Sequence, residues 1–347
     1  MRTRTTMRAG VLIAPGCVQV RDHPMPRAEP GGIVVRVRVA LTDGTDLKAY
    51  RRGHPKMAMP TLFGHEFSGE VLAAGEGVTA FKPGDAIASV HSAPCDTCFW
   101  CEHAQEELCE AVMETKILGA YAECIAIPKH IVERNAFVKP KNLSYEGAAF
   151  LEPLACVVHS LRYAGVERAE TLLVLGAGGF GILHAAAARA LGVPRVILAG
   201  RGPERSAFAP RFGFEYVADA REDALLAFVR ERTGGRGADL VIECTGASGV
   251  WESAPSFARR GGTASLFGGL PAESSVAFDA GRLHYDEVRI VSPFHFTPRA
   301  VREAFDLLVS GSIDPRPLIS GTYPLDRLTD AFAALDDRRG IKFAIVP

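Results

Sequence analysis

The first part of the chain carries short runs in which apolar and polar residues alternate. From Gly10 to about Leu143, such runs include GIVVRVRVA at positions 32–40 and AYAECIAIP at positions 120–128. Turns rich in glycine and proline, such as EPGG and KPGD, separate them. Alternation bounded by turn residues indicates β-strands. The pattern therefore predicts a compact, irregular β-rich domain.

At about Ala148 the pattern changes, and apolar strands begin to alternate with helical segments. TLLVL is followed by the helical segment ILHAAAARAL and the strand RVILA, and later by ADLVIECTG and GTASLFGG. Strand and helix in alternation predict a parallel sheet covered by helices. After about Phe294, two amphipathic segments and the strand KFAIVP predict a tail that packs back against the first domain. The sequence has no internal repeat or long linker, so we expect tightly coupled domains.

Length and charge narrow the class of protein. The 347 residues correspond to about two domains, and 48% hydrophobic residues suffice for packed cores. The 39 basic and 40 acidic side chains nearly cancel, which argues against nucleic acid or a membrane surface as a partner and favours small molecules. Neither a signal peptide nor a stretch of roughly 18 apolar residues is found. We therefore expect a cytoplasmic protein.

A glycine-rich turn joins the first strand and helix of the predicted parallel sheet. The segment VLGAGGFG contains Gly176, Gly178, Gly179 and Gly181. Glycine permits a tight turn and a close approach of the backbone to a pyrophosphate, and the helix N-terminus supplies unpaired N–H groups. Strand, turn and helix together predict a dinucleotide site. The alternative is a glycine-rich turn with no ligand.

The position about 20 residues beyond this fingerprint distinguishes NAD from NADP, because an NAD site places an acid there for the ribose hydroxyls. Here Gly200 occupies that place, Arg201 follows it, and Arg205 lies nearby. Guanidinium groups form charge-assisted hydrogen bonds to a 2′-phosphate, which a carboxylate would repel. The sequence favours NADP, and the alternative is that both arginines are solvated surface charges.

Four of the eight cysteines lie close together, whereas the other four are scattered. The segment CDTCFWCEHAQEELC contains Cys95, Cys98, Cys101 and Cys109. Four thiolates from one loop match the closed tetrahedral ligand set of a structural zinc, and disulfides conflict with the expected cytoplasmic location. Because no position remains for substrate, we expect this zinc to stabilise a lobe whose own core is small.

A second set of metal-binding residue types is dispersed along the chain. It comprises Asp43 in TDGTD, His65 and Glu66 in FGHEFSGEV, and Glu152 in FLEPLACVVH. The order of GHEFSGEV, the cysteine segment, EPLA and the glycine fingerprint resembles the zinc-dependent medium-chain alcohol dehydrogenases, particularly their sorbitol, threonine and sugar dehydrogenase branch. The resemblance runs from about Gly10 to the end of the sequence.

The resemblance implies an α/β protein with two domains. A GroES-like β-rich catalytic domain takes residues 1–150 and 295–347. A Rossmann domain with a doubly wound parallel sheet takes residues 151–294.

The resemblance also implies that Asp43, His65, Glu66 and Glu152 surround a catalytic zinc. Relatives usually carry cysteine at the position of Asp43, although some microbial sugar dehydrogenases carry aspartate. Aspartate oxygen reaches zinc at about the same distance as histidine nitrogen, and an oxygen-rich set admits other divalent ions. The alternative is that Asp43 is a turn residue of a metal-free site, with His65 and Glu66 structural.

The residues that follow Asp43 resemble the proton relay of the family. By this resemblance, Thr45 passes the substrate proton onward and Asp46 orients the imidazole of His65. Relatives often place a histidine three residues after the threonine, whereas this chain has Lys48, so proton exit differs or runs through water. Further candidates for lining the substrate cleft are His54, His91, His159 and His295. Each of these alone is more typical of a surface or packed residue.

Together these features predict a metal-dependent oxidoreductase that transfers a hydride between NADP(H) and an alcohol or carbonyl group. Glu66, Glu152 and the resemblance favour a polyol, a sugar or a cyclitol as substrate. One alternative is an NADPH-dependent carbonyl or alkene reductase without a catalytic metal, and another is a cofactor-binding protein without turnover. RLHYDEVRIVSPF resembles the strand region through which relatives associate, so we expect a homodimer or homotetramer.

Overall fold

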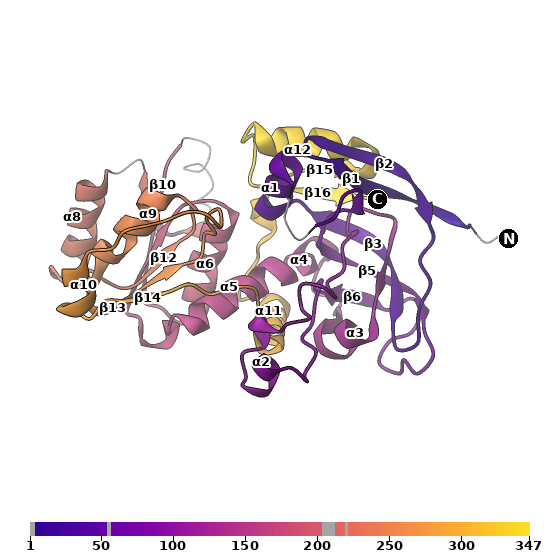
Figure 1. The fold of residues 1–347 in the computed structure, drawn as a ribbon, viewed down its shortest axis with the longest axis horizontal. Helices are drawn as coiled ribbons and strands as arrows, with labels where there is room; N and C mark the ends of the chain where they lie inside the picture. The colour runs from indigo at the N-terminus through magenta and orange to yellow at the C-terminus, as the bar shows by residue number, and fades with distance from the viewer. Residues whose placement is uncertain (1–3, 54–56, 203–211, 219–220) are drawn as a thin grey trace. The chain divides into compact units, whose positions relative to one another are not determined.

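The computed structural model describes residues 4–53, 57–202, 212–218 and 221–347. The chain forms two compact units (Figure 1), one of Met1–Ala155 with Thr297–Pro347 and one of Cys156–Phe296. The first unit is therefore discontinuous in sequence. No helix in the described part of the chain has the length and apolar character needed to span a bilayer.

The first unit consists mainly of β-structure. Its strands are β1 (Thr6–Ala14), β2 (Cys17–Pro24), β3 (Ile33–Leu41), β4 (Thr61–Leu62), β5 (Glu66–Ala74), β6 (Ala86–Ser89), β7 (Cys124–Ile127), β8 (Ala136–Val138), β15 (Ile319–Pro324) and β16 (Lys342–Val346). They form a three-stranded sheet, β2-β1-β4, and a seven-stranded sheet, β15-β16-β3-β5-β6-β8, in which β7 also pairs with β3. Strand β3 alternates as predicted, because Arg36 and Arg38 are exposed while Val35 and Val37 are buried.

Helices border these sheets. They are α1 (Gly44–Arg52), α2 (Phe99–Glu102), α3 (Lys129–Asn135), α4 (Tyr145–Ala148), α11 (Pro298–Val309) and α12 (Leu328–Asp336), with 3-10 turns at Glu106–Leu108, Arg316–Leu318 and Leu325–Arg327. The helix α5 (Leu151–Tyr163) crosses the division between the two units.

An aromatic cluster ties the C-terminal segment into the first unit. The ring centroids of Phe63 and Phe332 lie 5.4 Å apart, and Tyr121 meets both rings edge-on at 5.6 and 5.8 Å. All three side chains are fully buried. Strand β16 adds backbone pairing, since it runs antiparallel to β3. Residues after Thr297 are therefore integral to the core of this unit.

The second unit is a six-stranded sheet of order β11-β10-β9-β12-β13-β14 in which all neighbours are parallel. Its strands are β9 (Thr171–Leu175), β10 (Arg195–Gly200), β11 (Glu215–Ala218), β12 (Ala238–Glu243), β13 (Ala258–Leu266) and β14 (Arg289–Val291). Its helices are α6 (Gly179–Ala190), α8 (Glu222–Arg232), α9 (Ser248–Ser253) and α10 (Ala280–His284), with 3-10 turns at Val166–Arg168 and Ala254–Phe257.

The central strand β9 is buried at every position. This matches its uninterrupted apolar sequence, TLLVL, since parallel strands are covered on both faces. The predicted α/β class with a doubly wound parallel sheet is confirmed. The strand order reverses between β9 and β12, and the crevice at such a switch point is where sheets of this type bind ligands.

Candidate active site

The glycine fingerprint forms the turn between β9 and α6. Gly176 has a φ of +112°, a conformation that side chains rarely adopt, and an added Cβ would lie 2.8 Å from Thr245 Cγ2. Gly178 is the N-cap of α6. A Cβ on Gly181 would lie 1.7 Å from the carbonyl oxygen of Gly176. These glycines permit the turn and let the helix N-terminus, with its unpaired N–H groups, close onto the strand. Gly179 begins the helix.

Gly200 ends β10 directly beside this turn. A Cβ there would lie 2.5 Å from Ala177 Cβ and 3.1 Å from the Tyr216 hydroxyl. The close approach leaves no room for the ribose-binding acid that an NAD site carries. Arg201 follows and is exposed, whereas Arg205 lies outside the described residues.

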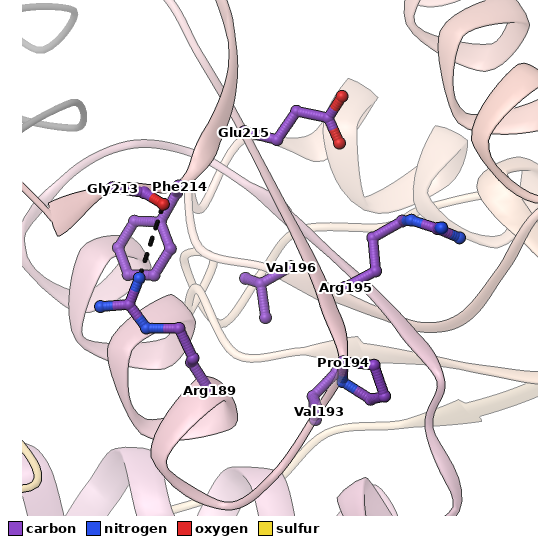
Figure 2. A pocket seen from close by; sticks show the side chains of 8 residues that line it. All are labelled: Arg189, Val193, Pro194, Arg195, Val196, Gly213, Phe214 and Glu215. Carbon is purple, nitrogen blue, oxygen red and sulfur yellow. Dashed lines mark hydrogen bonds between the residues drawn. The ribbon is translucent and has the colours of Figure 1, made fainter.

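A pocket of about 310 Å³ lies elsewhere in this unit, between the starts of β10 and β11 (Figure 2). Arg189 Nη1 donates to the Phe212 carbonyl at 2.7 Å, and the guanidinium lies 4.7 Å from the centroid of the Phe214 ring. The pocket is at the amino ends of the strands, whereas doubly wound sheets bind ligands at the carboxyl ends. It is therefore separate from the fingerprint.

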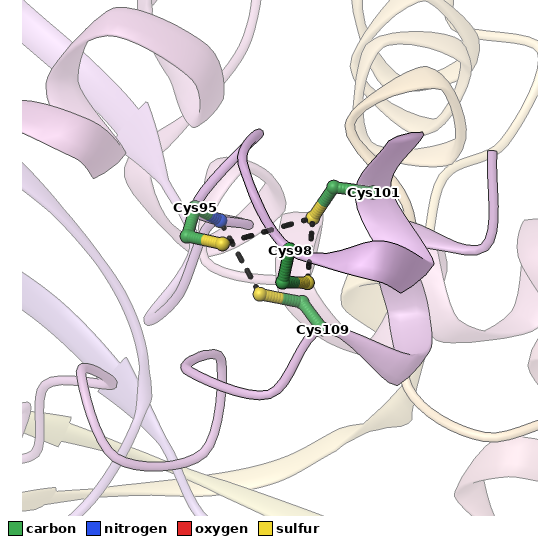
Figure 3. Close-up of side chains that lie close together, drawn as sticks. All are labelled: Cys95, Cys98, Cys101 and Cys109. Atoms are coloured by element: carbon green, nitrogen blue, oxygen red, sulfur yellow. Dashed lines mark hydrogen bonds between the residues drawn. The ribbon is translucent and has the colours of Figure 1, made fainter. Parts of the chain in front are cut away.

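The four predicted cysteines lie together in a loop of the first unit (Figure 3). Their sulfur atoms all lie within 4.8 Å of one another, with Cys98 and Cys101 3.5 Å apart and Cys95 and Cys101 4.0 Å apart. Sulfur atoms on one tetrahedral zinc, each bonded at 2.3 Å, are about 3.8 Å apart. The backbone N–H and hydroxyl of Thr97 lower the pKa of the Cys95 thiol to about 6, which favours the thiolate. The four residues fit a structural zinc.

A second group brings Asp43, His65 and Glu66 together in the same unit, again with ligand atoms within 4.8 Å of one another. Asp43 is the N-cap of α1, and its Oδ2 accepts the backbone N–H of Thr45 at 2.7 Å. Glu66 is the first residue of β5, and His65 directly precedes it. All three are buried.

His65 is oriented from behind by Asp46. Asp46 Oδ1 lies 3.0 Å from His65 Nδ1, and Nε2 faces Asp43 Oδ2 at 3.9 Å. Tyr121 donates its hydroxyl to Asp46 Oδ2 at 2.5 Å. Burial alone lowers the pKa of His65, but the charge and hydrogen bond of Asp46, with Glu152 and Asp43, raise it to about 10. Nε2 is thus the nitrogen that would face a metal.

Lys342 is a site residue that the sequence analysis missed. Its buried Nζ donates to Glu66 Oε1 and Oε2 at 2.6 and 2.5 Å and to the Thr42 carbonyl at 2.9 Å, and it lies 3.7 Å from Asp43 Oδ1. Burial lowers its pKa, but Glu66 and Asp43 raise it, so the ammonium stays charged. The signal was a lysine at the head of an otherwise apolar strand, KFAIVP. Tyr121, within AYAECIAIP, was missed because it reads as an ordinary core residue.

The remaining predicted residues lie around this group. Glu152 is buried and lies 3.4 Å from His91 Nδ1 rather than within the group of three. Its charge nevertheless reaches His65 and Lys342. Thr45 and Lys48 are exposed on α1. The ligand role of Glu152 and the relay roles of Thr45 and Lys48 stay predictions.

The other candidate histidines are dispersed. His91 is buried near His65, with ring centroids 5.1 Å apart. His159 and His295 belong to the second unit, where His295 stacks on Phe296. His54 lies outside the described residues. The structure brings His91 to the acidic group.

The donor chemistry fits a divalent cation. Four buried acids, those of Asp43, Asp46, Glu66 and Glu152, meet only one permanent cation, Lys342, among the described residues that form the site. Burial and the nearby charges of Asp43 and Glu152 raise the pKa of Glu66 although Lys342 lowers it. In the metal-free protein, protonated His65 offsets part of the excess. Imidazole nitrogen and carboxylate oxygen are zinc ligands, and a metal ion would replace that proton.

Comparison with known proteins identifies the family to which the chain belongs. Residues 29–136 match the family model of the alcohol dehydrogenase GroES-like domain, and residues 179–310 match that of the zinc-binding dehydrogenases. A protein named as a D-xylulose reductase A from Emericella nidulans is 30% identical over 94% of this chain and 93% of its own length. The chain belongs to the zinc-containing medium-chain alcohol dehydrogenase family. It is therefore an oxidoreductase of the dehydrogenase class acting on CH–OH groups.

Further relatives and solved structures agree over nearly the whole length. The sorbitol dehydrogenase of Bacillus subtilis (strain 168) is 28% identical over 94% of this chain and 92% of its own. A structure described as a zinc-binding dehydrogenase from Sinorhizobium meliloti 1021, bound to NADP, has 28% identity and a TM-score of 0.89, covering 99% of this chain and 100% of that one. The alcohol dehydrogenase TADH from Thermus sp. ATN1 has 29% identity and a TM-score of 0.88, covering 98% and 99%. As in this family, the fold pairs a GroES-like domain with a Rossmann domain.

Proposed function

We propose that this dehydrogenase is metal-dependent and transfers a hydride between NADP(H) and a secondary alcohol or ketone of a polyol, sugar or cyclitol. The observation that carries the proposal is the buried group of Asp43, His65 and Glu66, held by Asp46 and Lys342. Burying several charged groups together lowers the stability of a folded chain. Acids and bases with strongly shifted pKa values are typical of functional sites.

The substrate class is supported by the names of relatives that align over most of the chain. They include sorbitol dehydrogenases, D-xylulose reductases and a D-arabitol-phosphate dehydrogenase from Enterococcus avium. All of these names refer to polyols or the corresponding ketoses. Preference for NADP is supported by Gly200, whose contact with Ala177 excludes an acid, and by the exposed Arg201.

In the proposed mechanism, each residue has a defined task. A bound metal supplies a Lewis acid for the substrate oxygen, and the nicotinamide ring supplies the hydride acceptor. Asp43, His65 and Glu66 would hold the metal, with Glu152 as a further carboxylate. Asp46 keeps His65 Nδ1 protonated and its Nε2 available. Thr45 takes the proton of the substrate hydroxyl toward solvent, on the exposed side of α1 where Lys48 also lies.

The test is a panel of polyols, sugars and cyclitols, with ketoses in the reverse direction, followed at 340 nm with NADP(H) and NAD(H). We expect turnover of at least one hydroxylated substrate with higher kcat/KM for NADP. Arg201→Ala should weaken NADP binding by about tenfold or more while leaving NAD unchanged, because a lost charge-assisted hydrogen bond costs about 1.5–3 kcal/mol. Equal kcat/KM for both nucleotides in the parent enzyme would refute the NADP assignment.

One observation favours a second candidate, a carbonyl reductase of the same family without a catalytic metal. Lys342 already places an ammonium between Glu66 and Asp43. This buried positive charge neutralises part of the negative charge that a metal ion would otherwise neutralise. Elemental analysis of the purified protein distinguishes the two functions. The proposed enzyme contains about two metal ions per chain, whereas the reductase contains only the zinc of the cysteine lobe.

A further inference from the structure

Glu243 is a fully buried acid in the nucleotide-binding unit, and the proposed reaction has so far given it no role. It is the last residue of β12, at the carboxyl edge of the parallel sheet. Its strand neighbours are Leu175 on β9 and Leu266 on β13. Glu243 therefore lies at the switch point, at the end of β12, whereas the glycine fingerprint follows the neighbouring strand β9.

The carboxylate of Glu243 organises the loop that follows it. Oε1 accepts the backbone N–H groups of Thr245 at 2.6 Å and of Gly246 at 3.0 Å, together with the Thr245 hydroxyl. The backbone carbonyl of Glu243 accepts the N–H groups of Phe267 and Gly268, both at 3.0 Å. One residue thus holds the loops after β12 and β13 together.

The Thr245 loop lies directly against the fingerprint turn, and the loop after β13 lies against the Thr245 loop. A Cβ on Gly176 would lie 2.8 Å from Thr245 Cγ2, and one on Gly268 would lie 2.4 Å from the Gly246 nitrogen and 2.7 Å from Glu243 Oε2. At such distances a small shift of the Thr245 loop must displace the fingerprint turn or open a gap beside it. The position of this loop therefore sets the shape of the crevice.

We propose that Glu243 is a positioning residue for the nicotinamide nucleotide, whose carboxylate oxygen fixes the Thr245–Ala247 loop against the fingerprint turn. The proposal rests on the nucleotide site proposed above. All three loop bonds end on Oε1 of the carboxylate. A glutamine either directs its NH₂ toward these donors or presents a neutral oxygen, which accepts hydrogen bonds more weakly than a carboxylate does. Such a change loosens the loop without removing any group that contacts the strand core.

The chain offers a matched control on the same strand. Asp239 lies near the amino end of β12, and its Oδ2 likewise accepts two backbone N–H groups, of Glu170 and Thr171. Asp239→Asn therefore weakens comparable backbone hydrogen bonds at the opposite edge of the sheet, together with the ion pair between Asp239 Oδ1 and Arg259. The effect of Asp239→Asn on NADPH affinity measures the consequence of lower stability alone. The effect of Glu243→Gln also includes any displacement of the Thr245 loop.

The experiment measures the Kd of NADPH by fluorescence, with melting temperature, for the full-length parent, Glu243→Gln, Thr245→Val and Asp239→Asn. We expect Glu243→Gln to raise Kd about tenfold or more, Thr245→Val to raise it less, and Asp239→Asn to lower only the melting temperature. Raised KM for nucleotide with little change in kcat should accompany the rise in Kd. Glu243→Asp should restore part of the affinity.

Three results would overturn the inference. Parent-like Kd in a folded Glu243→Gln would show that the loop does not position the nucleotide. An equal loss of NADPH affinity in Asp239→Asn and Glu243→Gln would show that the effect comes from reduced stability and not from positioning. If Glu243→Gln does not fold, parent-like Kd in Thr245→Val refutes the inference. A parent protein that binds neither NADPH nor NADH would instead overturn the proposed function itself.

Discussion

At the scale of single residues, Asp43 has two tasks that one carboxylate can combine. Oδ2 caps α1 by accepting the Thr45 N–H, while the same side chain belongs to the group with His65 and Glu66. Although burial raises its pKa, the charges of Lys342 and His65 and the bonds from Thr45 lower it to about 2. The turn and ligand interpretations of Asp43 are therefore compatible with each other.

Substitutions that keep or remove the cap separate these tasks. Asp43→Ser retains an N-cap oxygen but removes the carboxylate, so we expect a melting temperature near that of the metal-free parent, loss of one metal equivalent and loss of most turnover. Asp43→Ala should in addition lose about 1 kcal/mol of stability. Asp43→Cys should keep the metal, because thiolate is a strong zinc ligand. Metal content and kcat check each variant. Two metal ions and normal turnover in Asp43→Ser would reduce Asp43 to a turn residue.

The protonation of His65 predicts how metal binding depends on pH. Its pKa in the metal-free protein is about 10, above the ordinary 6.5. Its proton therefore stabilises the metal-free fold fully below pH 6.5, and this contribution is lost as pH rises through 10. Because the metal displaces that proton, its apparent affinity should rise about tenfold per pH unit within this window. Titration against a metal buffer at several pH values measures the slope, and no slope would contradict the protonated state.

Lys342 predicts an interaction that a double-mutant cycle can measure. Lys342→Met leaves the Glu66 carboxylate buried without its ammonium, which should destabilise the metal-free protein by about 3–5 kcal/mol. Lys342→Met with Glu66→Gln should recover part of that loss, since both charges are then removed. Added metal should raise the melting temperature of Lys342→Met more than that of the parent. Additive single effects in denaturant unfolding would show that the ion pair is energetically unimportant.

At the scale of elements, the cysteine lobe depends on its metal because little else holds it. Its regular structure is the four-residue helix α2 and one 3-10 turn, and Phe99 and Leu108 are largely exposed. Cys101→Ser should therefore remove one zinc per chain, lower the melting temperature and increase hydrogen exchange across residues 95–112. Exchange in β9 and β12 of the other unit serves as the internal control. Unchanged zinc content and exchange would refute the structural role.

Predictability differed between elements for physical reasons. The strand TLLVL and the glycine turn after it could be predicted from the sequence, because contiguous residues specify a buried parallel strand and its turn. Strand β13 begins at Ala258, earlier than GTASLFGG suggested, because Arg259 and Arg260 fit a strand whose start is partly exposed. The Lys342–Glu66 contact joins residues 276 positions apart, and nothing local to either residue encodes it. Asp43, His65 and Glu66 were named by resemblance, and the fold supplied their proximity.

At the scale of the whole molecule, strand β14 ends the six-stranded sheet and leaves one edge without a neighbouring strand among the described residues. Large apolar side chains are exposed around it, with Tyr285 at 82% and Phe294 at 51%. Sheet edges of this kind pair readily with a second copy. We predict a homodimer, or a tetramer built from dimers, by solution scattering at micromolar concentration. Tyr285→Lys with Phe294→Lys should shift the mass toward the monomer, and a monomeric parent would contradict the prediction.

The discontinuity of the first unit has a consequence for biosynthesis. Residues 156–296 emerge from a ribosome as one stretch, so the nucleotide-binding unit can fold while the chain is still being made, as domains generally do. The other unit cannot close until β16 has reached β3. Until then, Asp43 and Glu66 lack the ammonium of Lys342. The unit of residues 156–296 should therefore become protease-resistant before the unit that begins at the N-terminus.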